Sequence, residues 1–596
     1  MKDDNRFIKH IYTRFLIGSV FALLASVVGQ IVNNIIIGNK LGVEALSITG
    51  LVVPIYYLFA TVGNLLGIGG AAVCSKLTGS GEHQKSRQAF TVTYLLSVVS
   101  ALLLTAITLP LLPWLIRLLG TPEALWQDVY RYSVVMIVGG VFTIGVYLAF
   151  NFLRLDGRTG ASMFVFVVMA LVNIALDFLF LYGLDMGIVG VSIATSAGAA
   201  AASIMGAVIL FTRGKSLRLT KFTLREGAEL SVQVLTTGSP GATENVAILL
   251  RSLVLNRLIL TSFGTVAMSA FSVIGSVNSF AISIIAGVSG TLVPFVGVFS
   301  AERDTRSMRQ LLWLSLRQGT VLTCLFAVVC MVFRSQIGAM FGMSGPVEGE
   351  LVSVAILLFG VSLLPSLVNN ILICLHLSNG HTAIANVLTL SRNFVGIVLP
   401  ALLLSKLIGV NGVWHSFWVC EVLTLLLALV LQWIAARKSP YVSTWTLINS
   451  EAEKNGHYIS FSVEDNLESI TGCVDSISEF CEENELSPKR AMMISLSLEE
   501  MLNSILTHSL SSHQGLTMNV RILLFDGGVI LRIRNAGEQF NPLRYYEEKK
   551  ENLEGDGLDA MLELEDSLGI KMIVDTAEAI DYRRTFGVNN LTVILS

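Results

Sequence analysis

Charged side chains are scarce in this sequence. Asp, Glu, Lys and Arg make up 14% of its 596 residues, whereas 53% are hydrophobic and the mean hydropathy is +0.69. Soluble globular proteins carry roughly 25% charged residues. The composition therefore argues against a single soluble enzyme and favours a chain embedded in a membrane over most of its length.

Cysteine is scarce as well, and the phosphate loop of ATP-driven motors is missing. The seven cysteines include no Cys-x-x-Cys pair and no metal-ligand spacing, so we expect reduced, buried thiols. No GxxxxGK[ST] motif occurs. A signal peptide is not expected, because the first apolar stretch, from about Ile11 to Ile37, is long enough to be retained as a membrane span.

The charge is unevenly distributed along the chain. Residues 1–440 contain 28 Lys and Arg against 17 Asp and Glu, whereas residues 441–596 contain 12 against 26. The first part is apolar and mildly basic, and the second is acidic with an ordinary charge density. We therefore predict a membrane domain over 1–440, a linker over 441–456 and a separate domain over 457–596.

The membrane part contains recurring apolar segments of roughly 20 residues, the length of a spanning helix. The longest and most basic break, around 212–230, divides them into two lobes of six spans, a plan typical of secondary transporters. The twelve predicted spans are 15–37, 46–72, 90–112, 130–152, 162–183, 187–211, 232–258, 266–298, 313–333, 351–375, 383–405 and 410–435.

Loop charges predict the orientation of these spans. Lys and Arg gather before the first predicted span and after the second, fourth, sixth, eighth and twelfth. Positive residues collect on the cytoplasmic side of a membrane. We therefore expect a multi-pass protein of the cytoplasmic (inner) membrane with both termini, and hence the acidic domain, in the cytoplasm.

Polar residues at bilayer depth are costly and indicate function. In the fifth predicted span Asn173 and Asp177 are four residues apart and share a helix face, and the next span supplies Thr195. A carboxylate, an amide oxygen and a hydroxyl suit a site for H⁺ or Na⁺. The alternative is that Asp177 lies near the outer interface and is simply solvated.

An ordered series of motifs runs through residues 10–440: IVNNIIIG at 31–38, GIGG at 67–70, NFLRLDG at 151–157, NIALD at 173–177, GIVG at 187–190 and GVNGVW at 409–414. In order and spacing they resemble the multidrug and toxin extrusion (MATE) transporters. The resemblance implies an antiporter that exports amphipathic, often cationic, compounds in exchange for H⁺ or Na⁺. It also implies that Asn173, Asp177 and Thr195 occupy the cation-site positions of the first lobe.

Two further features concern cation coupling. Asn33 stands where the family usually has Asp, and an amide can bind a cation but cannot take up a proton. Glu244, at the start of the seventh predicted span, is a second candidate for a proton or a cationic substrate; the alternative is a residue at the cytoplasmic edge that pairs with Arg251.

Arg392 and Glu421 are expected to form a structural pair or to snorkel.

The segment 457–596 has the pattern of an α+β domain. We predict helices at 467–484, 488–508, 552–564 and 568–575, and strands at 457–463, 516–524, 529–535, 579–584 and 590–595. Because this domain is acidic, we expect it to face a partner or the basic loops at 213–225 and 303–309.

Three stretches of this domain, LEEMLNSILTH at 498–508, RIRNAGEQFNP at 532–542 and SLGI at 567–570, follow one another in a characteristic order. They resemble the boxes of the histidine-kinase-type ATPase (GHKL) fold, especially its anti-sigma-factor branch. The resemblance implies a Mg-ATP site with Glu500 as the catalytic acid and Asn503 or Ser504 at Mg²⁺. It further implies that Asn535, Gly537 and Gly569 surround the nucleotide.

Each of these boxes is imperfect. If Glu499 is the acid, Asn503 has the expected spacing but His508 comes one residue late; if Glu500 is the acid, His508 fits and Ser504 replaces the Mg²⁺-binding Asn. Asn535 replaces an Asp that would carry a charge to the adenine amine. The alternative is a fold that is retained without nucleotide binding.

Together these patterns predict a cation-coupled exporter with a cytoplasmic regulatory domain. Its partners would be a small-molecule substrate, the lipid bilayer and a cytoplasmic regulatory protein, and no nucleic acid. Two alternatives stay open: a membrane receptor that signals through the C-terminal domain, and a flippase for lipid-linked precursors.

Overall fold

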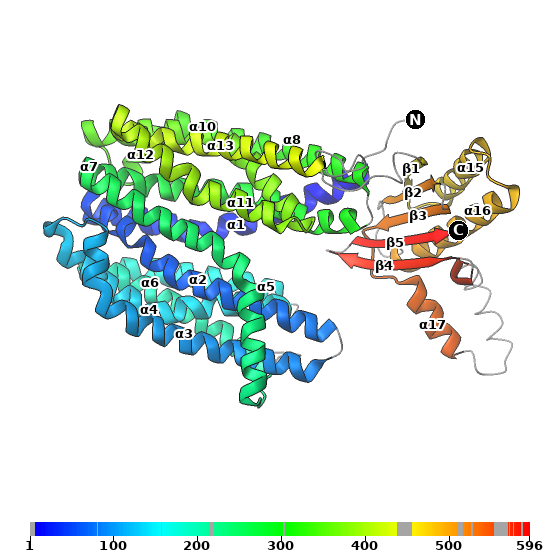
Figure 1. Cartoon of the computed structure of the whole chain (residues 1–596), viewed down its shortest axis with the longest axis horizontal. Helices are drawn as coiled ribbons and strands as arrows, with labels where there is room; N and C mark the ends of the chain where they lie inside the picture. Colours follow the sequence, from blue (N-terminus) through cyan, green and yellow to red (C-terminus); the bar gives the residue numbers. More distant parts are fainter. Residues whose placement is uncertain are drawn as a thin grey trace. The chain divides into compact units, whose positions relative to one another are not determined.

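The computed structural model describes residues 6–79, 82–156, 158–213, 218–301, 304–437, 456–510, 517–525, 528–552, 570, 573–575, 577–585 and 588–595. Helices form most of the chain up to residue 436, and a five-stranded sheet lies in its C-terminal part (Figure 1). The chain divides into two compact units. One comprises Gly18–Gly290 and Leu316–Leu431, and the other Met1–Ile17, Thr291–Ser315 and Gln432–Ser596.

Long apolar helices are the expected form of this sequence, because a helix satisfies its own backbone polar groups inside a bilayer. The helical segments are α1 (Arg6–Leu41), α2 (Val43–Gly79), α3 (His83–Leu118), α4 (Glu123–Leu155), α5 (Thr159–Phe178), η1 (Leu179–Gly183), α6 (Gly187–Arg213), α7 (Leu224–Ala301), α8 (Thr305–Val332), α9 (Arg334–Met340), α10 (Pro346–Ser378), α11 (Thr382–Leu390), η2 (Ser391–Val395), α12 (Gly396–Ile408) and α13 (Val410–Ala436).

The predicted spans lie inside these helical segments, with at most one residue outside, and several of the helices extend well beyond the predicted ends. One difference concerns two of the spans. The spans predicted at 232–258 and 266–298 form one stretch, α7, whose backbone leaves the helical region only at Gly264 (φ 82°). Glycine adopts this positive φ without the strain that a side chain would add. Ten helices in the described part of the chain are long and apolar enough to cross a membrane, one of them within α7, so the number twelve stays a prediction.

Small residues bring α4 and α6 together at the centre of the first lobe. A Cβ atom built on Gly139 would lie 2.3 Å from the Ser196 hydroxyl, and one on Gly145 would lie 2.1 Å from the Ser203 hydroxyl. Such contacts allow transmembrane helices to approach closely. Helix α5 also packs on α6, which brings its polar residues next to those of α6.

The C-terminal domain is α+β, as predicted. Its antiparallel sheet has the order β1-β2-β3-β5-β4. The strands are β1 (His457–Glu464), β2 (Thr517–Phe525), β3 (Gly528–Asn535), β4 (Ala579–Thr585) and β5 (Val588–Leu595). The helices are α15 (Leu467–Glu483), α16 (Pro488–Ile505), the π-helical turn η3 (Leu506–Leu510) and α17 (Pro542–Asn552).

Helix α17 is not among the predicted elements. The helix predicted at 552–564 lies almost entirely outside the described residues, as does most of the linker at 441–456, and the helix predicted at 568–575 is described only at 570 and 573–575. The segment 542–552 has six charged residues in eleven and few apolar ones, which is why its periodicity gave no signal. All seven cysteines are free thiols, as predicted.

The two faces of the sheet differ in chemistry. Val520 and Ile522 of β2 and Ile533 of β3 belong to the hydrophobic core that α15 and α16 complete. Side chains alternate along a strand, so Arg521 and Arg534 point to the opposite face. One face therefore carries the core, and the other carries buried arginines.

Candidate functional site

The first candidate site lies between α5 and α6. Asn173 on α5 is 8% exposed, and its Nδ2 donates to Thr195 Oγ1 on α6 at 3.3 Å. The Thr195 hydroxyl in turn donates to the carbonyl of Val191 at 3.0 Å. The predicted meeting of Asn173 with Thr195 is thus present in the structure.

Asp177 lies one turn after Asn173 and is completely buried. Neither of its carboxylate oxygens accepts a hydrogen bond from any described residue. Tyr132 of α4 is near enough to interact with it electrostatically. Because an isolated buried carboxylate is very costly, this group needs a proton or a bound cation, and its burial does not fit the alternative of a solvated residue.

The other two predicted coupling residues are not joined to this group. Asn33 on α1 has a buried Oδ1 without a hydrogen-bond partner among the described residues. Its neighbour Asn34 donates from Nδ2 to Ser276 Oγ of α7 at 2.7 Å. Glu244 is exposed and forms no ion pair with Arg251 in the described part of the chain. Its role in coupling and its place at the cytoplasmic edge both stay predictions.

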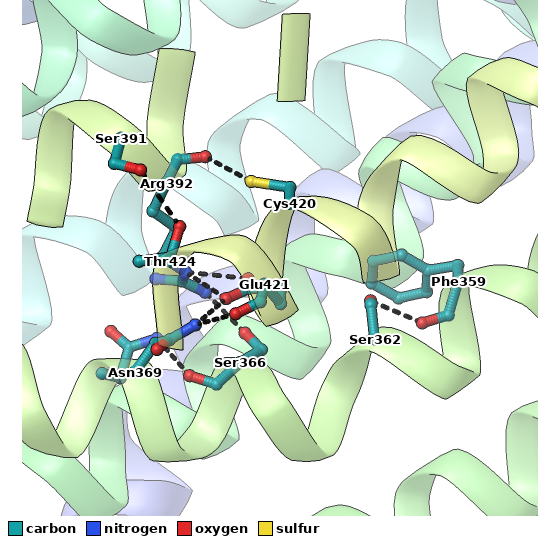
Figure 2. Close-up of polar contacts among 10 residues, drawn as sticks. Phe359, Ser362, Ser366, Asn369, Ser391, Arg392, Cys420, Glu421 and Thr424 are labelled. Atoms are coloured by element: carbon teal, nitrogen blue, oxygen red, sulfur yellow. Dashed lines mark hydrogen bonds and ion pairs between the residues drawn. The ribbon is translucent and has the colours of Figure 1, made fainter. Parts of the chain in front are cut away.

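The second lobe contains a buried polar cluster that sequence analysis found only in part. The Arg392 Nε donates to both carboxylate oxygens of Glu421, at 2.8 and 3.0 Å, which confirms the predicted structural pair. Asn369 Nδ2 also donates to Glu421 Oε2 at 2.7 Å, and Arg392 Nη2 donates to Ser366 (Figure 2). Sequence analysis missed Asn369. Two adjacent asparagines within an apolar helix, here α10, could have indicated it, but they belong to none of the motifs.

A π-helical turn presents Arg392 to this cluster. Arg392 lies in η2, and the Cys420 thiol donates to its backbone carbonyl at 3.2 Å (Figure 2). Glu244 is close enough to Arg392 for an electrostatic interaction. The buried carboxylate of this cluster, Glu421, is therefore paired with a cation, unlike Asp177.

In the C-terminal domain the first box lies on α16. Glu499 and Asn503 are both half-buried, whereas Glu500 is exposed and Ser504 is half-buried. Asn503 Oδ1 is buried without a hydrogen-bond partner in the described residues. Residues four apart share a helix face, so Glu499 with Asn503 is the more enclosed of the two possible pairs, the other being Glu500 with Ser504.

Asn535 of the second box is held in a closed network. Its Oδ1 accepts from Ser509 Oγ at 2.9 Å, from Gly537 N at 3.0 Å and from Asn589 Nδ2 at 2.9 Å. A carbonyl oxygen has two lone pairs, so this oxygen is saturated. The side chain therefore has only its Nδ2, a donor, to offer a ligand.

Gly537 is required by a close backbone approach. A Cβ atom there would lie 2.2 Å from the carbonyl oxygen of Ser509. Glu538 N donates to that same oxygen at 2.7 Å, which fixes the turn after β3. The third box cannot be placed beside this turn, because Ser567 and Gly569 lie outside the described residues.

The MatE family model matches residues 19–179 and 240–402. This chain belongs to the MATE family. The model of the histidine kinase-like ATPase domain matches residues 463–595, so the chain joins a MATE transporter to a domain of that fold.

Relatives of the MATE part are named as exporters. The multidrug export protein MepA of Staphylococcus saprophyticus is 22% identical over 429 residues, which cover 71% of this chain and 92% of that protein. MepA of Staphylococcus haemolyticus is 23% identical over 426 residues, covering 71% and 92%. This MATE chain is therefore a relative of multidrug exporters over nearly their full length.

Solved structures show the same fold. An inward-facing multidrug resistance MATE transporter superposes with a TM-score of 0.62 at 21% identity, covering 70% of this chain and 96% of that one. The MATE transporter DinF-BH, solved in complex with R6G, gives a TM-score of 0.60 at 23% identity, covering 72% and 96%. The MATE fold and the multi-pass membrane character follow.

Proposed function

We propose that this MATE protein is an antiporter that exports amphipathic or cationic small molecules across the cytoplasmic membrane in exchange for H⁺ or Na⁺. Family membership and the exporter relatives support the transport of small molecules. The distribution of loop charges supports cytoplasmic termini. Coupling to a cation is the step that the site between α5 and α6 supports.

The observation that carries this proposal is the state of Asp177. Its carboxylate is buried, has no hydrogen-bond partner among the described residues and lies one turn from the Asn173–Thr195 pair. Such a group binds a proton or Na⁺ in one state of the cycle and releases it in another. Asn33 cannot take up a proton, so Asp177 is the titrating residue of the first lobe.

The test is substrate export by the full chain in proteoliposomes under imposed gradients. A pH gradient and a Na⁺ gradient are applied separately, with ethidium as a cationic probe. We expect one of the two gradients to drive uphill ethidium movement at least tenfold faster than no gradient. Ethidium movement that neither gradient accelerates would contradict cation-coupled export.

For the C-terminal domain we propose weak binding of Mg-ATP and a regulatory role toward transport. Asn503, with its buried and unpartnered oxygen, is the candidate ligand of Mg²⁺, and Glu499 beside it is better enclosed than Glu500. With its Oδ1 saturated, Asn535 offers no acceptor to the adenine amine. We therefore expect a Kd on the order of 0.1–1 mM, which millimolar ATP would still fill.

Isothermal titration of the full chain in detergent with Mg-ATP tests this part. Saturable binding with a millimolar or submillimolar Kd, lost on Asn503→Ala, is the expected result. A titration that shows no heat at several millimolar would leave the domain as a protein-interaction module. That outcome would not affect the transport proposal.

A further inference from the structure

Asp304 lies between α7 and α8 and is completely buried. Three arginines of the C-terminal domain surround its carboxylate. The Arg521 Nη1 donates to Oδ1, and Arg534 Nη2 donates to Oδ2 at 2.8 Å. The Arg532 Nη1 lies 3.8 Å from Oδ2. Asp304 and the three arginines belong to the same compact unit of the chain.

The arginine face, defined as Arg521 on β2 with Arg532 and Arg534 on β3, lies opposite the hydrophobic core of the domain. Each of the three side chains is 5% exposed or less. Arg521 and Arg532 are direct partners in the register of the two strands. Like charges placed opposite each other destabilise a sheet, and the negative charge of Asp304 offsets this repulsion.

Asp304 also organises the start of α8. Its Oδ1 accepts from the backbone N–H of Ser307 at 2.9 Å, the contact of an N-cap residue. Arg534 Nη1 donates to Ser307 Oγ at 3.1 Å. One carboxylate thus caps the helix and receives the arginines, so the beginning of α8 and the sheet are held through the same group.

Aromatic contacts reinforce the same interface from both sides. The Arg306 guanidinium of α8 lies 4.2 Å from the ring centroid of Tyr458 on β1. The Arg534 guanidinium lies 4.6 Å from the ring centroid of Phe299, near the end of α7. Stacking of this kind adds to charge pairing when the groups are removed from water.

At the Asp304 contact, the signs of the charges on the loop and on the domain are the reverse of those expected from composition. The acidic domain was predicted to face the basic loops at 213–225 and 303–309. At the second of these, within the described residues, the loop supplies a carboxylate and the domain supplies the guanidinium groups. Net charge did not reveal this, because the arginines of β2 and β3 alternate with core residues and are few.

We propose that the arginine face is the docking surface through which the C-terminal domain holds the junction of α7 and α8, and that Asp304 is the residue it recognises. Any displacement of the start of α8 during transport then either carries the domain along or breaks the contact with Asp304. The domain thus restrains the transport helices from within the same chain. This inference depends on the contacts of Asp304 and not on nucleotide binding.

Hydrogen exchange of the full chain in nanodiscs tests the docking. Asp304→Asn removes the charge that all three arginines share. We expect amide exchange to rise at least tenfold both in 304–312 and in β2 and β3, while α15 is unchanged. The matched control is Asp156→Asn, which removes another buried loop carboxylate that pairs with an arginine, Arg158, at 3.1 Å. This control should leave both segments as in the wild type.

A second variant and a second readout keep the test decisive. Arg534→Lys preserves the charge but not the two-point contact of the guanidinium, so a smaller rise in the same two segments is expected. Export by both variants should rise at least threefold once the restraint on α8 is released. Unchanged exchange, exchange that rises evenly through the whole domain, or unchanged export despite local release would each overturn the proposal.

Discussion

Arg534 and Asn535 are consecutive residues of β3 whose side chains enter separate networks on opposite faces of the sheet. Arg534 Nε donates to Asn590 Oδ1 at 3.3 Å and its Nη2 donates to Asp304, whereas Asn535 Oδ1 accepts from Asn589 Nδ2 at 2.9 Å. Asn589 and Asn590 are also consecutive, on β5. The proposed nucleotide box and the contact with Asp304 are therefore separated by one peptide unit on each of two paired strands.

This arrangement predicts that nucleotide binding affects the junction of α7 and α8. Saturating Mg-ATP should change amide exchange in 304–312 at least twofold, because a shift of β3 at Asn535 moves Arg534 with it. The measurement is hydrogen exchange of the full chain with and without Mg-ATP, and Asn503→Ala serves as the control that removes binding. An exchange pattern that differs only around the nucleotide box would show that the two faces are not coupled.

The saturated oxygen of Asn535 predicts a gain of affinity on restoring a carboxylate. Asn535→Asp keeps one oxygen for Ser509, Gly537 and Asn589 and provides a charged second oxygen for the adenine amine. Hydrogen bonds to charged groups contribute about 1.5–3 kcal/mol, so Mg-ATP should bind about tenfold more tightly or better. Titration calorimetry measures this.

The matched control for that variant is Asn466→Asp, which adds the same charge at the N-cap of α15, where either residue caps well. Its affinity for Mg-ATP should equal that of the wild type. If Asn535→Asp binds no more tightly than this control, Asn535 does not meet the base.

The docking contact should not depend on pH in the physiological range. Burial alone would raise the pKa of the Asp304 carboxyl, but the charges of Arg521, Arg534 and Arg532 outweigh this and hold the pKa well below its usual range. A lowered pKa means that the ionised carboxylate stabilises the folded form at every pH above the ordinary Asp pKa near 4. This stabilisation is lost only as the pH falls through the folded-state pKa. Exchange in 304–312, corrected for its intrinsic pH dependence, should therefore be constant from pH 8 to 5. A loss of protection between pH 6 and 5 would contradict it.

The polar cluster of the second lobe should be structural. Glu421→Gln leaves Arg392 buried beside a neutral side chain, and loss of one partner of a buried ion pair costs about 3–5 kcal/mol. We expect a clear fall in the melting temperature of the detergent-solubilised chain. Glu350→Gln, at an exposed position of the same lobe, should melt like the wild type. Equal melting temperatures for the two variants would show that the Arg392–Glu421 pair contributes little stability.

Sequence patterns predicted the helices and strands well because each has a local cause. Apolar length marks the spans, and alternation marks strands such as β1 and β2. The boundary at Gly264 was predicted as a loop, yet helix continues on both sides of it, because one positive φ is enough to redirect the chain. Helix α17 was missed because it has almost no apolar face.

The candidate sites were predictable where residues lie close in sequence or match a motif, as with Asn173, Asp177 and Thr195. Contacts between distant segments were not. Asp304 and Arg534 are 230 residues apart, and nothing local to either residue indicates the other. The same holds for Asn535 and Asn589, whose pairing depends on β5 lying beside β3 in the sheet.

Export driven by an ion gradient, measured in proteoliposomes that contain the Asp177→Asn variant, tests the central proposal most directly. This variant keeps one side-chain oxygen at position 177 but cannot be charged or take up a proton, so export driven by an ion gradient should fall at least a hundredfold while the protein folds normally. Asp185→Asn is the matched control: it lies just beyond the same helix, is exposed, and pairs only loosely with Lys40 at 3.7 Å, and its export should match the wild type. Undiminished ion-driven export by well-folded Asp177→Asn would contradict the assignment of this carboxylate as the coupling group.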